Sequence, residues 1–402
     1  MWAELRPVGQ DPKTRGYRRF AWTREDHTLR EWFAGECAAR GLAVVEDRAG
    51  NQWGWSGDPD ATPGVVVGSH LDSVADGGAF DGPLGVVSAF AALDALRESG
   101  FTAAVPLGVA NFADEEGARF GVACAGSRIL TGVLDPGRAL SLTDADGVTL
   151  AQAWRRDGRD PAALGPDPQA LSRIAAYVEL HVEQGRALCG GPDDPGSDPA
   201  TRDPRRAVAI GTEIWPHGRW RIDVVGEANH AGTTRLEDRL DAMLGFASVV
   251  ATARVLARER GCLATVGKVI ARPNAVNAIA ERVTAWLDAR GADPESVRGL
   301  VETLTEEFRD DGTTVQEVSW TPATAFDSAL RERIGRLLPQ APVLATGAGH
   351  DAGILANAGV PTAMLFVRNP TGISHAPREH AERADCLRGV DALAAVVRDL
   401  AG

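Results

Sequence analysis

Four short apolar runs each end in a cluster of charged or imidazole side chains, and this pattern constrains the fold most strongly. The runs are "GVVVGS", "AVPLGVANF", "AAYVEL" and "PTAMLFV", and helical segments such as residues 82–100 lie between them. Strands that alternate with helices predict an α/β fold with a mostly parallel sheet. In such sheets ligands bind beyond the carboxyl ends of the strands, so we expect the clusters to meet. Their members are His70, Asp72 and Asp81, then Asp114, Glu115 and Glu116, then His181, Glu183 and Gln184, and finally His375.

Residues 214–325 have a different pattern from the rest of the chain. They read as strand, helix, strand, strand, helix and strand, which is the order of a ferredoxin-like α+β module. The chain has 402 residues, more than one hydrophobic core usually organises. We therefore predict a catalytic domain from residues 1–213 and 326–402, with an inserted domain at 214–325. Residues 189–206 are rich in Pro, Gly and Asp and predict an exposed loop, either a lid or a surface insertion.

Composition excludes several classes of partner. The formal net charge of −13 argues against nucleic acid or an anionic membrane as the main partner, because both need basic patches. Five cysteines are scattered without a C-x-x-C pair, which is typical of thiols in a reducing cytoplasm. The first residues have no apolar core of signal-peptide type, and no long apolar stretch predicts a membrane helix. We expect a cytoplasmic protein, and a small anionic substrate remains compatible with this charge.

The residue types in the four clusters indicate metal chemistry. Imidazole and carboxylate without thiolate suit Zn²⁺, Mn²⁺, Co²⁺ or Ni²⁺ and argue against a structural zinc site. Neighbouring carboxylates, as in Glu115–Glu116, allow one to bind a metal while the other acts as general base. Asp72 is spaced to accept the second N–H of His70, and Asp76 is expected only to be solvated. Any one cluster alone could be a solvated polar loop, but four of them at strand ends favour a site.

Seven segments carry a resemblance to a known family. They are "GSHLDSVADGGAFDGPLGV", "ADEEGARFG", "ELHVEQG", "GEANHAGTT", "PNAVNAI", "GAGHDA" and "GISHAP". In the same order, they closely resemble the M20-type binuclear metallohydrolases, in the amidase, hydantoinase and carbamoylase branch. That branch holds N-carbamoyl-L-amino-acid hydrolases, β-ureidopropionases and allantoate amidohydrolases. The resemblance covers nearly the whole chain.

The resemblance implies two divalent metal ions per chain and assigns particular residues as the ligands of each ion. It places one ion on His70 and His181 and the other on Glu116 and His375, with Asp81 bridging the two. Zn²⁺ or Mn²⁺ is the expected metal, with Co²⁺ or Ni²⁺ as alternatives.

The resemblance also implies roles for residues outside the ligand set. Glu115 matches the general base, and Gln184, Asn277 and Arg290 match substrate-binding positions, with Arg290 as the carboxylate clamp. The inserted domain is implied to form a homodimer, in which His230 reaches the partner's active site to stabilise an oxyanion. Without the resemblance, His230 and Asn277 read as turn residues and Arg290 as a surface charge.

The expected function is hydrolysis of the ureido C–N bond of a small carboxylate, with release of ammonia and CO₂. Allantoate is the first expected substrate, because "LFVRNPTGISHAP" and "GYRRFAWT" resemble segments of allantoate amidohydrolases. N-carbamoyl-L-amino acids, or a β-ureidopropionase-like substrate, are the alternative, and an M20 peptidase or aminoacylase is third. A non-catalytic descendant would be expected to lack ligands or base, and this chain has residues at every such position.

Overall fold

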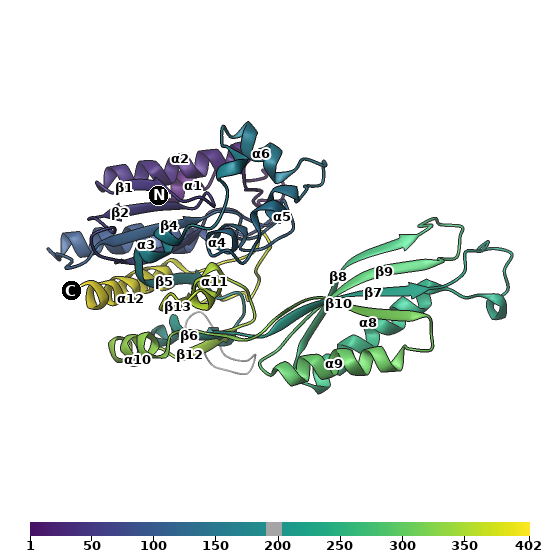
Figure 1. The fold of residues 1–402 in the computed structure, drawn as a ribbon. Coiled ribbons are helices and arrows are strands. Elements are labelled where there is room, and N and C mark those ends of the chain that lie inside the picture. Colours follow the sequence, from purple (N-terminus) through teal and green to yellow (C-terminus); the bar gives the residue numbers. More distant parts are fainter. Residues whose placement is uncertain (190–202) are drawn as a thin grey trace. The chain divides into compact units, whose positions relative to one another are not determined.

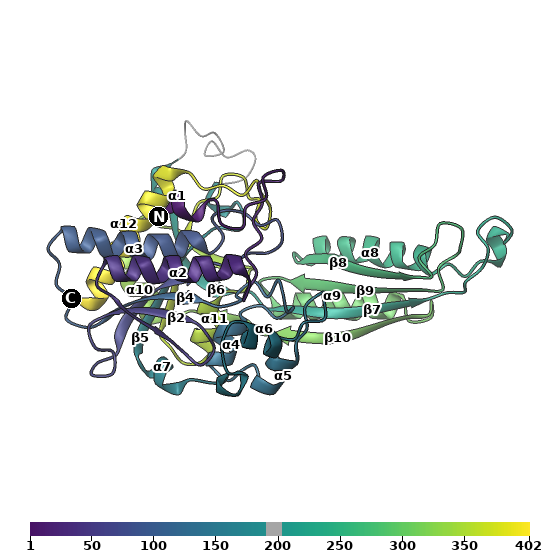
Figure 2. The same cartoon turned by 90° about the horizontal axis from the view of Figure 1, so that it is seen from above.

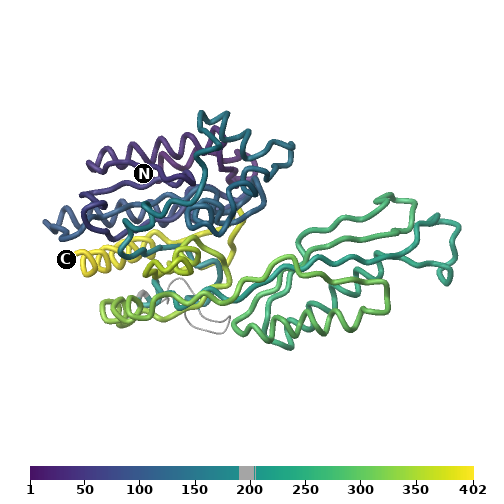
Figure 3. Tube along the Cα trace, in the orientation of Figure 1, coloured from purple at the N-terminus to yellow at the C-terminus, as the bar shows by residue number. Residues whose placement is uncertain are grey.

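The computed structural model describes residues 1–189 and 203–402, so most of the predicted loop at 189–206 lies outside the described residues. The chain forms two compact units, one of Met1–Thr212, Ala325–Leu344 and Gly349–Gly402 and one of Glu213–Thr324 and Ala345–Ala348. Figure 3 shows both ends of the chain in the first unit and the middle of the chain, in green, forming the second. Among the described residues, no helix has the length and apolar character needed to cross a membrane.

The first unit is built on a nine-stranded sheet with the order β1-β2-β4-β3-β5-β13-β6-β11, with β12 pairing with β6. Its strands are β1 (Ala43–Glu46), β2 (Gln52–Ser56), β3 (Gly64–His70), β4 (Leu107–Phe112), β5 (Ile174–Val182), β6 (Val208–Ile214), β11 (Thr324–Ala325), β12 (Val343–Thr346) and β13 (Thr362–Val367). The central strands β4, β3, β5 and β13 run parallel, whereas β1, β2 and β6 pair antiparallel with their neighbours. The predicted mostly parallel sheet is therefore confirmed at the centre, where the polar clusters follow the strands.

Helices cover both faces of this sheet, which explains why its central strands are mostly apolar and buried (Figure 2). Every residue of β3, β4 and β13 is buried. On one face α2 (Arg24–Ala39), α3 (Pro83–Glu98), α10 (Ser328–Leu337) and α12 (Arg383–Ala401) form the main hydrophobic core with the strands. The other helices of this unit are α1 (Trp2–Leu5), α4 (Ala125–Leu130), α5 (Pro136–Ser141), α6 (Leu150–Arg156), α7 (Pro168–Ser172) and α11 (Asp351–Asn357), with short 3₁₀ turns at Pro161–Ala163, Ala187–Cys189 and Pro204–Arg206.

The second unit is a four-stranded antiparallel sheet with the order β10-β7-β9-β8, and two helices pack on one of its faces (Figure 1). Its elements are β7 (His217–Val225), the 3₁₀ turn Leu236–Asp238, α8 (Ala242–Glu259), β8 (Leu263–Arg272), β9 (Arg282–Arg290), α9 (Pro294–Glu307) and β10 (Thr313–Thr321). Alternate residues of β7, namely Trp220, Ile222 and Val224, are buried against the helices. This order and pairing confirm the predicted ferredoxin-like module.

Candidate metal centre

Asp81 lies at the centre of the candidate site, in the loop between β3 and α3. The next residue, Gly82, has φ +83°, and a Cβ on it would lie 2.4 Å from the ring of His70. Only glycine combines this backbone angle with so close an approach. The loop therefore brings the carboxylate of Asp81 beside the imidazole at the end of β3.

Two groups of candidate ligands share Asp81. The first group is His70, Asp81 and His181, and the second is Asp81, Glu116 and His375. One carboxylate oxygen of Asp81 lies 3.2 Å from Nε2 of His181 and 3.8 Å from Nε2 of His70. Its other oxygen lies 3.4 Å from Nε2 of His375, which is 3.5 Å from the carboxylate of Glu116. A carboxylate with one oxygen toward each group has the arrangement that a bridge between two ions requires.

The loop after β4 holds Glu115 and Glu116, and Asp72 fixes its backbone. The N–H groups of Glu115 and Glu116 donate to the two oxygens of Asp72, over 3.2 Å and 3.0 Å. Asp72 also lies 3.2 Å from Nδ1 of His70. Sequence reasoning anticipated the contact with His70 but missed the two backbone contacts. Asp72 thus connects the first two ligand loops.

The electrostatics of the site favour cations. Burial raises the pKa of Glu116 to about 7, and the carboxylate of Asp81 adds to this rise. Burial likewise raises the pKa of Glu115 well above its ordinary value. Contact with Asp81 raises the pKa of His375 to about 9. The carboxylates of Asp72, Asp81, Glu115 and Glu116 face three imidazoles, and the raised pKa values show that this cluster holds protons that divalent cations would replace.

The donor set also fits divalent metal ions. Nε2 of His70 and Nε2 of His181 are buried, and neither has a hydrogen-bond partner within the described part of the chain. Nδ1 of His181 lies 2.9 Å from the carbonyl of Val182, which leaves Nε2 as the ligating nitrogen. Buried polar atoms rarely stay unpartnered, so nitrogens aimed at a carboxylate bridge are consistent with a metal site.

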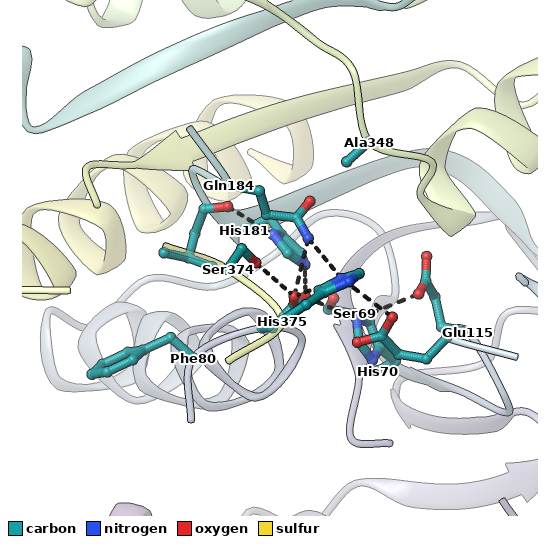
Figure 4. A network of polar contacts seen from close by, with 12 residues as sticks. Ser69, His70, Phe80, Glu115, His181, Gln184, Ala348, Ser374 and His375 are labelled. Carbon is teal, nitrogen blue, oxygen red and sulfur yellow. Dashed lines mark hydrogen bonds and ion pairs between the residues drawn. The ribbon is translucent and has the colours of Figure 1, made fainter. Parts of the chain in front are cut away.

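Gln184 and His375 complete the group in the first unit. The amide Nε2 of Gln184 donates to Asp81 over 3.0 Å and lies 3.4 Å from Nε2 of His375. Figure 4 shows these two side chains directed at the same point as the hydroxyl of Ser374. The imidazole of His375 is 51% exposed, whereas those of His70 and His181 are buried. Within the first unit, the side of the site where His375 lies is therefore exposed to solvent.

Sequence reasoning missed several residues around the site. Glu379 accepts from the backbone N–H of Asp81, the hydroxyl oxygen of Ser374 lies 3.1 Å from Asp81, and Cys124 donates its thiol hydrogen to Glu115 over 3.3 Å. Asp76 is exposed, as expected, and it also accepts a hydrogen bond from the Thr14 hydroxyl over 2.8 Å. The closeness of Glu379 to His375 in "SHAPREH" was the one available signal, and it does not reveal the contact with Asp81.

The second unit holds His230, Asn277 and Arg290, and it separates them into two places. His230 pairs with Ala278 in an isolated β-bridge, and the carbonyl of Asn277 accepts from Ala231, so His230 and Asn277 are neighbours. Arg290 is the last residue of β9 and pairs with His217, at the far end of the β7–β9 ladder. Its guanidinium contacts both carboxylate oxygens of Asp288 and the carbonyl of Gly347.

The fold and the donor set define a metal-dependent hydrolase. A mostly parallel sheet positions imidazole and carboxylate groups at the carboxyl ends of its central strands, and a separate ferredoxin-like unit is inserted in the chain. Residues 57–399 match the model of peptidase family M20/M25/M40. The chain belongs to this family, in its hydantoinase/carbamoylase amidase branch, whose members are metallohydrolases acting on C–N bonds.

Similar proteins span the full length of the chain. An N-carbamoyl-L-amino acid amidohydrolase of Geobacillus stearothermophilus is 36% identical over 411 residues, covering 99% of this chain and 96% of the relative. An allantoate amidohydrolase of Escherichia coli (strain K12) is 30% identical over 412 residues, with the same coverage. The crystal structure of an amidase of the hydantoinase/carbamoylase family from Burkholderia vietnamiensis superimposes with a TM-score of 0.84 at 29% identity. That match covers 100% of this chain and 95% of the other. The predicted family and enzyme class are confirmed.

Proposed function

We propose that this protein hydrolyses the ureido C–N bond of a small carboxylate, using two divalent metal ions bridged by Asp81. The observation that carries the proposal is the division of the ligands into two groups that share one carboxylate. His70 and His181 would hold one ion, and Glu116 and His375 the other. Two cations at this position would lower the pKa of a water molecule and polarise the substrate carbonyl.

Glu115 is the general base in this proposal. It belongs to neither ligand group, and its carboxylate lies 3.8 Å from Nε2 of His70. Burial raises the pKa of its carboxyl well above the ordinary value, which suits a group that must take a proton and return it. The Glu115 carboxylate would accept a proton from the attacking water and donate it to the leaving nitrogen.

His230 is suited to donate a hydrogen bond to a developing oxyanion. The N–H of Gly232 donates to Nδ1 of His230 over 3.0 Å. A neutral imidazole that accepts at Nδ1 carries its proton at Nε2. His230 therefore presents an Nε2–H donor from an exposed loop, which is the group that stabilisation of an oxyanion requires.

The separation of Arg290 from His230 and Asn277 supports a site shared by two copies of the chain. Arg282 and Arg290 stand at opposite ends of β9, eight residues apart, which corresponds to about 26 Å at roughly 3.3 Å per residue. His230 and Asn277 lie beyond the Arg282 end. A small substrate held by Arg290 of one copy cannot also contact His230 of that copy, so the partner must supply the imidazole.

The exposed edge of the second unit offers the surface for this homodimer. Strand β8 is the outer strand of the sheet, and its residues are mostly exposed, including Val269 and Ile270 at 44% and 45%. Leu244 on the neighbouring helix α8 is 68% exposed. An unpaired strand edge with apolar side chains is a template for pairing with another chain. We propose that β8 and α8 form the dimer interface.

Two substrates fit the proposal, and different observations favour each. Allantoate is favoured by the segments "LFVRNPTGISHAP" and "GYRRFAWT", which resemble those of allantoate amidohydrolases. An N-carbamoyl-L-amino acid is favoured by the higher identity, 36% against 30%, to the N-carbamoyl-L-amino acid amidohydrolase. Both carry a ureido group and a carboxylate, so the same groups of the site would act on either.

Ammonia release decides between them. The purified protein, loaded with Mn²⁺ or with Zn²⁺, is assayed for ammonia release on allantoate, on N-carbamoyl-L-amino acids and on β-ureidopropionate. Hydrolysis of dipeptides, which yields amino acids and no ammonia, is followed by the appearance of free amino groups. We expect turnover of a ureido carboxylate and at least tenfold lower kcat/KM on dipeptides, which lack the ureido group. Turnover of dipeptides alone would refute the proposed function.

A further inference from the structure

Glu379 is a buried carboxylate that belongs to neither ligand group, and it connects two ligand loops that are distant in sequence. Its side chain is 4% exposed. One carboxylate oxygen accepts the backbone N–H groups of Phe80 and Asp81, both over 2.9 Å. The other oxygen lies 2.9 Å from the hydroxyl oxygen of Ser374, whose single hydrogen can be donated either to Glu379 or to Asp81. Charge-assisted hydrogen bonds of this kind are the stronger ones in proteins.

The contacts of Glu379 reach Asp81, the candidate bridge, by two routes. Ser374 Oγ lies 3.1 Å from Oδ2 of Asp81 as well as 2.9 Å from Glu379, so one hydroxyl lies between the two carboxylates. Glu379 therefore holds Asp81 twice, directly through its backbone N–H and indirectly through Ser374. Because Ser374 directly precedes His375, the same carboxylate also fixes the loop of that imidazole.

The side chain of Glu379 packs directly against the backbone of Gly78, where no other residue would leave room for it. A Cβ on Gly78 would lie 2.3 Å from Oε1 of Glu379 and 2.5 Å from its Cβ. The N–H of Glu379 donates to the carbonyl of Ala376 over 3.0 Å, so a turn after His375 returns the side chain to the Asp81 loop. Gly78 and the turn after His375 therefore both allow the carboxylate of Glu379 to reach the Asp81 loop.

We propose that Glu379 is a positioning residue, which sets the orientation of the Asp81 carboxylate between the two ions and the place of His375. This inference rests on the proposed binuclear site. Outer carboxylates that hold metal ligands change metal affinity by about 10–100-fold when they are removed. The effect of Glu379 falls on the second ion, because His375 and the Oδ2 side of Asp81 are the groups it holds.

A series of substitutions separates this role from general stabilisation. Glutamine at position 379 retains all three contacts, since its carbonyl accepts two N–H groups and its amide donates to Ser374. Glu379→Ala removes all three contacts, Glu379→Asp shortens the side chain by one methylene, and Ser374→Ala removes only the link to the carboxylate of Asp81. Asp47→Asn is the control, because Asp47 is a buried carboxylate in another turn that also accepts backbone N–H groups.

Mn²⁺ is titrated calorimetrically into the full chain after removal of metal, and thermal unfolding is measured in parallel. We expect two bound ions in the wild type and in Glu379→Gln, and a second ion bound about 10–100-fold more weakly in Glu379→Ala, Glu379→Asp and Ser374→Ala. Asp47→Asn should lower Tm and leave Mn²⁺ affinity unchanged. Wild-type affinity in Ser374→Ala and in whichever Glu379 variants fold would overturn the inference alone. A wild type that binds fewer than two ions would overturn the proposed function and this inference with it.

Discussion

The backbone N–H of Gly232 donates to Nδ1 of His230 over 3.0 Å, and this bond keeps the proton of a neutral imidazole on Nε2. The loop is held further by Thr234, whose hydroxyl donates to the carbonyl of His230 over 2.8 Å. An exposed histidine is thus fixed in tautomer and place. These two hydrogen bonds would prepare the imidazole to donate from Nε2 to a molecule outside its own unit.

His230→Ala should lower kcat by about 10²–10³-fold, the usual cost of losing one oxyanion donor. If the imidazole acts across the dimer, mixing His230→Ala chains with Glu115→Gln chains should restore activity, because each mixed dimer has one intact site. The measurement is ammonia release after subunit exchange. Absence of any recovery, with mixed dimers verified by mass spectrometry, would place His230 outside the partner's site.

Glu115→Gln should lower kcat by about 10²–10⁴-fold, since an amide cannot accept the proton of the attacking water. The variant should still bind two metal ions, because Glu115 belongs to neither ligand group. Metal analysis after dialysis checks the second expectation. Loss of one ion together with activity would show that Glu115 acts as a ligand.

Arg290→Ala should raise KM for ureido carboxylates by about 10–100-fold, corresponding to the loss of a charged hydrogen bond. Three of its N–H groups bind Asp288 and Gly347, and a guanidinium has five, so two remain for a carboxylate. Arg221→Ala is the matched control, because Arg221 is an arginine of β7 paired with Asp223. An equal change of KM in both variants would show that the loss of one positive charge, and not the loss of a contact between Arg290 and the substrate, causes the effect.

Metal affinity should rise with pH up to about 9. The contact with Asp81 raises the pKa of His375 to about 9, so below that pH its imidazole holds a proton that a metal ion must displace. Between about pH 7 and 9, release of the His375 proton gives about a tenfold gain in apparent affinity per pH unit, and below about pH 7 the proton of Glu116, whose pKa burial raises to about 7, adds to this dependence. Calorimetry in buffers of different protonation enthalpy counts the released protons. In His375→Ala the corresponding proton release should be missing.

If the proposed dimer forms through β8 and α8, Leu244→Glu should convert it to monomers and lower activity, because the substitution places a charge on the proposed interface. Val318→Glu is the control, since Val318 is 57% exposed on β10, the opposite edge of the same sheet. Sedimentation velocity distinguishes the two forms. If Leu244→Glu stayed dimeric and Val318→Glu became monomeric, the interface would lie at the β10 edge and not at β8 and α8.

The candidate ligands were predictable because strand ends in a parallel sheet share one edge. Each apolar run that was expected to be a strand is one, so the polar clusters that contain His70, Glu116, His181 and His375 were predictable from their places at or just after the ends of β3, β4, β5 and β13. The choice of ligand within each cluster came from the family resemblance. The order of the ferredoxin-like unit was equally visible, since its helices and strands alternate in a characteristic sequence.

What the sequence did not reveal are contacts between loops. Glu379 and Asp81 are 298 residues apart, and no periodic pattern links a carboxylate in one turn to a backbone N–H in another. Asp72 was expected to act on His70, but its bonds to Glu115 and Glu116 depend on how the loop after β4 bends back. The position of Arg290 far from His230 likewise depends on the strand pairing.

The place of β13 in the sheet has a consequence for how the protein is made. Strand β13 lies between β5 and β6, yet Thr362 follows Val182 only after the whole second unit has been synthesised. Until β13 arrives, β5 and β6 each present an open edge, and the pairing that closes the gap spans a very long stretch of chain. Completion of the sheet therefore waits for β13, and the candidate ligand His375 follows that strand in the chain. Nascent chains halted before residue 362 lack both the strand that joins β5 to β6 and one ligand of the second group, so we expect them to be inactive.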